Sequence, residues 1–272
     1  MAIYPIHDDN PSFSKPYVLW SLLAINTVAW LLLQGAGLDH HQLSKSIANF
    51  GISGDAAISG EFYRFITHAF LHGSWSHFLF NMLFLWVFGN DVEDVMGHKK
   101  FIIFYALAST ASSLPELIIN PGSVPLIGAS GAISAVMGAY LLMYPKVRVY
   151  IPLFLIYRIF LIPVPAILLM LFYLFFDAVG FAAQLESIGK VTYLSGSQVA
   201  YGAHVIGFAF GFLAALFFKN NEVLSQQPHA GWNGQKLDES NMPKFIKCSV
   251  DVLNKVILGM IVLALIIIVF TK

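Results

Sequence analysis

The sequence has few charged residues and almost no cysteine. Charged side chains make up 11% of its 272 residues, whereas hydrophobic side chains make up 57%. A soluble domain carries about 25% charged residues, so this chain has too little polar material to cover a globule in water. Its single cysteine, Cys248, cannot form an internal disulfide, which also excludes thiolate metal clusters and two-cysteine redox chemistry.

The sequence also lacks an excess of charge of either sign. Fifteen basic and fifteen acidic residues cancel. This balance removes the general electrostatic argument for a nucleic-acid partner or an acidic partner. The composition therefore indicates a protein whose main solvent is the lipid bilayer.

Seven stretches are candidates for membrane spans, each of which needs about 20 mostly apolar residues. They are residues 17–37, 75–96, 100–119, 128–144, 163–181, 199–218 and 256–271. The fifth is expected to begin at Pro163-Val164-Pro165, with residues 147–160 as a connection on the membrane surface. Residues 38–74 are expected to carry short interfacial helices. The sequence therefore predicts an all-α, multi-pass membrane protein.

The basic residues predict the orientation of these spans, because short cytoplasmic loops retain more Lys and Arg. With the N-terminus inside, ten basic residues lie on the inner side and four on the outer side, with Arg158 near the inner boundary. The expected organisation is a cytoplasmic tail (1–16), a six-helix core (17–220), a cytoplasmic linker (221–253) and a seventh transmembrane helix (254–272). The expected location is the cell (inner) membrane.

Polar side chains inside apolar spans are costly unless they meet one another or line water, so their positions indicate function. Such residues lie near the starts of three spans: His77 and Asn81 in the second, Ser130 in the fourth and His204 in the sixth. His77 and Asn81 are four residues apart and share one helix face. Because these spans all run from outside to inside, we expect the three clusters at one depth.

Small residues predict how two of these spans pack. The sixth span has Gly207 and Gly211 four residues apart, and the fourth has Gly131 one residue after Ser130. Small residues at this spacing allow two helix backbones to approach closely. If these stripes meet, Ser130 and His204 come within reach as a nucleophile and its base.

The acidic residues do not suggest a third member of this pair. Asp91, Glu93 and Asp94 lie at the inner end of the second span, and Asp177 is expected at the outer end of the fifth as an interfacial cap rather than a proton carrier. The residues therefore favour a Ser–His dyad. His77, Asn81 and the backbone N–H of Ser130 are candidate donors to an oxyanion.

Taken in order, these residues resemble the rhomboid family of intramembrane serine proteases. The matching elements are Glu61-Phe62-Tyr63-Arg64, His72 with Trp75, His77 with Asn81, Gly89 with Glu93, Gly128-Ala129-Ser130-Gly131, and Ala203-His204 followed by Gly207 and Gly211. The resemblance covers residues 17–218. It implies a six-helix catalytic bundle, and the seventh helix resembles the six-plus-one arrangement of part of the family.

The resemblance also implies roles for individual residues. Ser130 would be the nucleophile, His204 the general base and acid, and His77 and Asn81 oxyanion-hole donors. The supporting residues would be Gly128, Gly131, Gly207, Gly211 and the loop residues Glu61 and Arg64. The implied partners are single-span membrane proteins as substrates and the lipid bilayer, without a metal or organic cofactor, and the site would open to the outer face.

One position departs from the family pattern, and other readings remain open. Many bacterial members have an aromatic residue four positions after the nucleophile, where this chain has Ser134.

The alternatives to a protease are a non-catalytic relative that binds membrane helices and a transporter. His68, His72 and His77 also admit a metal reading, although no His-Glu-x-x-His pattern occurs.

Overall fold

The computed structural model describes residues 5–119, 125–155, 158–186 and 199–227. Each of the first six expected spans is helical. The helices are α1 (Tyr17–Val28), continued by η1 (Ala29–Leu33), then α5 (Trp75–Met96), α6 (His98–Ile119), α7 (Ser130–Met143), α8 (Ala166–Glu186) and α9 (Tyr201–Phe218). The seventh expected helix, residues 254–272, lies outside the described residues.

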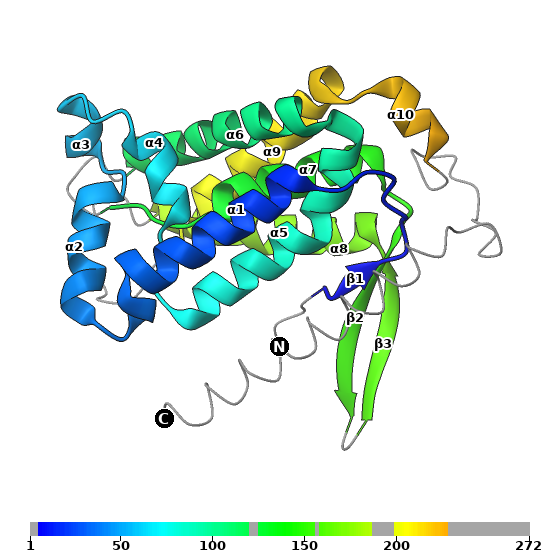
Figure 1. Ribbon diagram of the computed structural model, residues 1–272, viewed down its shortest axis with the longest axis horizontal. Helices are drawn as coiled ribbons and strands as arrows, with labels where there is room; N and C mark the ends of the chain where they lie inside the picture. Colours follow the sequence, from blue (N-terminus) through cyan, green and yellow to red (C-terminus); the bar gives the residue numbers. More distant parts are fainter. Residues whose placement is uncertain (1–4, 120–124, 156–157, 187–198, 228–272) are drawn as a thin grey trace.

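Helix α7 forms the centre of the bundle (Figure 1). All its residues except Ser130 and Leu142 are buried. A helix that is apolar on every side can be stable only when other helices surround it, and α5, α6 and α9 all pack against α7. By length and composition, α6, α8 and α9 are each able to cross a membrane, among the described residues.

The segment between α1 and α5 contains the short helices predicted for residues 38–74, together with one turn just before them. They are η2 (Gly35–Gly37), α2 (His40–Phe50), α3 (Gly54–Ile58), α4 (Arg64–Thr67) and η3 (His68–Phe70). Side-chain caps fix two of their starts, because Asp39 accepts from His41 N and Gln42 N, and Ser53 accepts from Ala56 N. These helices gather at one end of the bundle, which we call the α2 end (Figure 1).

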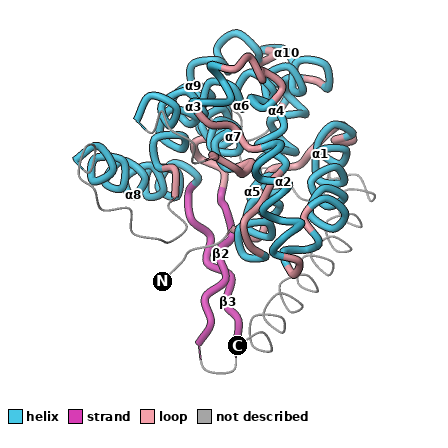
Figure 2. The backbone as a smooth tube through the Cα atoms, turned by 90° about the vertical axis from the view of Figure 1, so that its left-hand side faces the viewer, coloured by secondary structure: helices cyan, strands magenta, loops and turns pink. Residues whose placement is uncertain are grey.

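The connection between α7 and α8 differs from the prediction. It forms a hairpin of β2 (Arg148–Leu155) and β3 (Arg158–Pro165), joined on one side by the short β1 (His7–Asp8) in the order β1-β2-β3. The Pro163-Val164-Pro165 segment therefore ends a strand, and α8 begins only at Ala166. Figures 1 and 2 show the hairpin projecting across the direction of the helices, at what we call the hairpin end.

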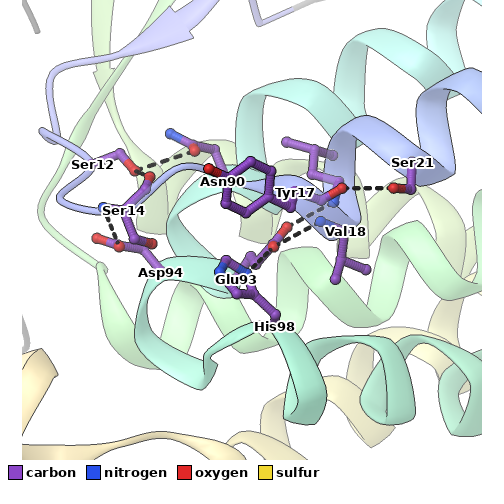
Figure 3. Close-up of polar contacts among 10 residues, drawn as sticks. Ser12, Ser14, Tyr17, Val18, Ser21, Asn90, Glu93, Asp94 and His98 are labelled. Carbon is purple, nitrogen blue, oxygen red and sulfur yellow. Dashed lines mark hydrogen bonds and ion pairs between the residues drawn. The ribbon is translucent and has the colours of Figure 1, made fainter. Parts of the chain in front are cut away.

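The N-terminal residues pack against the helices at the hairpin end. The carboxylate of Asp94 accepts hydrogen bonds from Phe13 N (2.9 Å) and Ser14 N (2.8 Å), as Figure 3 shows for Ser14. The same carboxylate accepts from Gln227 Nε2, just after α10 (Asn221–Gln226). Asp94 thus holds together the two ends of the described chain.

Glu93 caps the start of α1 from the end of α5. Its carboxylate accepts from Val18 N (2.9 Å) and Leu19 N (2.7 Å), while Pro16 at the N-cap offers no side-chain bond. His98 Nδ1 lies 2.6 Å from the same carboxylate (Figure 3). A fully buried carboxylate is stable here because it satisfies two helix-terminal N–H groups and faces the positive end of the helix dipole.

Helices α7 and α9 touch through their backbones, as their small residues predicted. A Cβ added to Gly207 would collide with the carbonyl oxygen of Gly131, and one added to Gly211 would collide with that of Ala135. In the opposite direction, a Cβ on Gly138 would collide with the carbonyl oxygen of Phe208. These contacts leave no room for any side chain larger than hydrogen.

We expect Gly211→Ala to lower stability by about 1 to 3 kcal/mol, because the new methyl group forces two backbones apart. The measurement is the thermal midpoint of the purified protein in detergent. Gly73→Ala is the control, because its new Cβ would lie 3.6 Å from Ile127 Cδ1, an ordinary contact. Equal midpoints for the two variants would contradict the close packing of α7 and α9.

We expect Glu93→Ala to lower the free energy of unfolding by about 2 to 4 kcal/mol, because it leaves two N–H groups of α1 without acceptors. Denaturant titration in detergent measures this loss. Asn90→Ala, at the same end of α5, removes only one hydrogen bond, with Ser12 Oγ, and should cost less. A smaller loss for Glu93→Ala than for Asn90→Ala would show that Glu93 is not the cap.

Candidate active site

Ser130 is the first residue of α7 and is half-buried at the α2 end of the bundle. Gly128, two residues earlier, has φ +118°, a backbone conformation that favours glycine. A Cβ at Gly128 would also lie 2.7 Å from His77 Nε2 and 3.7 Å from Ser130 Oγ. Glycine is therefore needed for the turn into α7 and for the space beside Ser130. Ala129, at the N-cap, provides no side-chain hydrogen bond to the helix.

His204 lies in the first turn of α9, where that helix crosses the start of α7. Gly207 contacts the backbone of Gly131, and a Cβ at Gly131 would lie 3.6 Å from Ala203 Cβ. The immediate neighbours of Ser130 and His204 are therefore in contact with each other. The structure brings the two predicted spans together at the residues that the sequence singled out.

The hydrogen bond of His204 differs from the expectation. In the part of the chain that the structure describes, His204 Nδ1 lies 3.1 Å from Asp177 Oδ1 of α8, and His204 makes no hydrogen bond to Ser130. Asp177 had been expected as an interfacial cap. Asp177 instead faces His204 of α9, and it lies nine residues before the end of α8 at Glu186.

The surroundings of His204 come from α8 and from its own helix. The ring of Tyr201 meets the imidazole edge-on, with centroids 6.5 Å apart. Helix α8 packs closely here, since a Cβ at Gly180 would lie 2.6 Å from the Tyr201 ring, and one at Gly202 would lie 2.8 Å from Phe181. Ser134, the residue at the family's aromatic position, is buried in α7.

His77 and Asn81 lie on one face of α5, as their spacing predicted. The buried Nδ2 of Asn81 has no hydrogen-bond partner among the described residues. Leaving a buried donor unpaired costs about 1 to 3 kcal/mol, so such a group marks a place where a ligand can supply the acceptor. His77 Nε2 lies against Gly128, two residues before Ser130.

Two further histidines, His68 and His72, are buried in the segment just before α5. Burial lowers the pKa of His68 to about 4 and that of His72 to about 3, so both are neutral near pH 7. The rings of His72 and His77 meet edge-on at 5.2 Å. Among the described residues, no three His, Cys, Asp or Glu side chains are grouped as metal ligands would be.

Glu61 and Arg64 hold the short helices together. The two side chains form an ion pair, and Arg64 donates to the carbonyl oxygens of Ala48 (2.6 Å) and Gly51 (2.9 Å). These contacts join α4 to the end of α2. Both residues lie in the segment between α1 and α5.

Comparisons with known proteins point to the same family as the sequence motifs. The family model of the Rhomboid domain matches residues 59–221. The chain is 31% identical over 128 residues to rhomboid protease GluP of Bacillus subtilis, covering 47% of this chain and 24% of that protein. It is 30% identical over 169 residues to RHOMBOID-like protein 12, mitochondrial, of Arabidopsis thaliana, covering 56% of this chain and 48% of that protein.

A third relative is rhomboid protein 1, mitochondrial, of Saccharomyces cerevisiae, 30% identical over 149 residues, with 52% of this chain and 41% of that protein matched. The chain thus matches less than half the length of each of these three relatives. The family match spans more than half of the chain and contains every residue of the candidate active site. The protein is an integral membrane protein that belongs to the rhomboid family.

Proposed function

We propose that this protein is an intramembrane serine endopeptidase that cleaves single-span membrane proteins in or near their transmembrane segment. The observation that supports this most directly is the backbone contact of α7 and α9, which brings Gly131 and Ala203, the neighbours of Ser130 and His204 in the chain, close together. A serine hydroxyl needs such a neighbouring base to become an effective nucleophile. The relatives named as proteases support the same activity at the level of the family.

The reaction begins with attack by Ser130. His204 Nε2 accepts the hydroxyl proton as Ser130 Oγ forms a bond to the carbonyl carbon of the substrate peptide. The carbonyl oxygen becomes an oxyanion. His204 then gives its proton to the leaving amine as the C–N bond breaks, which leaves the acyl group on Ser130.

Water completes the cycle by the same proton path. His204 removes a proton from water, the hydroxide attacks the acyl carbon, and the bond to Ser130 Oγ breaks as His204 returns the proton to it. The second product leaves as a carboxylic acid. This step needs water at membrane depth, which predicts a polar passage to Ser130 from the α2 end.

The oxyanion is stabilised by donors from two helices. Asn81 Nδ2 is buried without a partner, and His77 Nε2 lies beside the same turn of chain as Ser130. The backbone N–H of Ser130 is a third donor at the start of α7. Donors that are fixed before the reaction stabilise the developing charge without reorganisation.

The proposed orientation places the N-terminus inside and the α2 end at the outer face of the cell membrane. The basic residues support it, because Lys146 and Arg148 lie at the hairpin end together with Lys99 and Lys100. The competing proposal is a non-catalytic rhomboid-like protein that binds membrane helices. The presence of both Ser130 and His204 favours catalysis.

We expect Ser130→Ala and His204→Ala to abolish cleavage of a labelled single-span substrate, because each removes a group that forms or breaks a bond. The assay uses the purified full chain in liposomes, with products separated by mass. Ser134→Ala, one turn further along α7, is the control and should cleave normally. Cleavage by Ser130→Ala at the rate of the unmodified protein would exclude Ser130 as the nucleophile.

We expect Asn81→Ala to lower kcat by about ten- to a thousandfold, the effect of losing one oxyanion donor. Asn90→Ala, on the same helix but at the hairpin end, should leave kcat unchanged. Steady-state kinetics on the same substrate measure both values. An unchanged kcat for Asn81→Ala would assign Asn81 to helix packing instead.

A further inference from the structure

The imidazole of His204 has two nitrogens, and catalysis needs each in a defined state. Nε2 must be unprotonated to accept the proton of Ser130, so the ring proton must reside on Nδ1. A neutral histidine in solution exchanges between both tautomers. Some neighbour must therefore select the tautomer and hold the ring, and the residue at the family's aromatic position, Ser134, is too small to stack on it.

We infer that Asp177 is a positioning residue for His204, an inference that rests on the proposed function. Its Oδ1 lies 3.1 Å from His204 Nδ1, within hydrogen-bond distance. A carboxylate can only accept, so the contact requires the proton on Nδ1 and leaves Nε2 free. No proton passes to Asp177 in any step, because the proton moves between Ser130, His204 Nε2 and the leaving group.

The packing of α8 on α9 keeps the two side chains together. Gly180 and Phe181, three and four residues after Asp177, contact Tyr201 and Gly202, which lie three and two residues before His204. The side chains of His204 and Asp177 are only 17% and 26% exposed. Two helices in tight contact thus fix the separation of the base and the carboxylate.

The Asp177 carboxylate also stabilises the positive charge that develops on His204. When His204 accepts the proton of Ser130, the imidazole becomes a cation. Asp177 stabilises that cation more than the neutral ring, so its interaction is stronger in the transition state than at rest. This predicts that Asp177 contributes to kcat rather than to substrate affinity.

The test compares Asp177→Asn and Asp177→Ala with the unmodified full chain. We expect kcat to fall by about ten- to a hundredfold, the scale of a hydrogen bond to a charged group, with KM within twofold. The rate at which a fluorophosphonate probe labels Ser130 should fall by the same factor, since labelling needs the nucleophile and its base but no substrate. Asp177→Glu, which keeps the carboxylate, should recover part of both rates.

Two comparisons separate positioning from a general effect on the fold. Glu186→Gln removes the same charge from an exposed position of α8 and should leave kcat and labelling unchanged. The thermal midpoint of each variant accompanies these rates, and Asp177→Asn should keep that of the unmodified protein.

Several outcomes would overturn the inference. Asp177→Asn with unchanged kcat and labelling would show that the carboxylate is not needed, and a change in KM alone would assign it to substrate binding. Failure of the probe to label Ser130 in the unmodified protein would instead refute the proposed function, and this inference with it.

Discussion

The glycines of α9 lie directly against the backbone of α7, and the geometry of the candidate site follows from this contact. Gly207 meets the carbonyl of Gly131. Gly131 is one residue after Ser130 in α7, and Gly207 is three residues after His204 in α9. In lipid there is little hydrophobic force between helices, so close van der Waals contact is a main source of their association. The same contact therefore contributes to stability and sets the relative positions of the helix starts that carry Ser130 and His204, the proposed nucleophile and base.

The features that could be predicted from the sequence are those that depend on residues near one another in the chain. The spacing of His77 and Asn81 fixes their common face, and the Gly207 and Gly211 stripe predicts which surface of α9 approaches another helix. The common membrane depth expected for His77, Asn81, Ser130 and His204 rests on counting along spans that run in the same direction. The first six helical spans are confirmed, although the fifth begins at Ala166 instead of Pro163, and the seventh lies outside the described residues. The roles of Ser130, His204, His77 and Asn81 stay proposals.

The features that the sequence analysis missed depend on contacts between residues far apart in the chain, or lie in segments whose hydrophobic residues show no regular spacing. Asp177 was assigned to the end of its helix because the fifth span was expected to stop near residue 181, but α8 continues to Glu186. The hairpin of β2 and β3 is almost uniformly apolar, so it lacks the alternation that identifies a strand. The bond of Phe13 N to Asp94 joins residues 81 positions apart, and no local pattern indicates it.

Helix α7 begins at Ser130 without a side-chain cap, since Ala129 cannot supply one. The amide groups of its first turn therefore have no carbonyl partner within their own helix, and they give this end a partial positive charge. These donors belong to the main chain, so no change of side chain removes them. Part of the electrostatic attraction for an anion at this end is thus built into the backbone, and it persists however the surrounding side chains diverge.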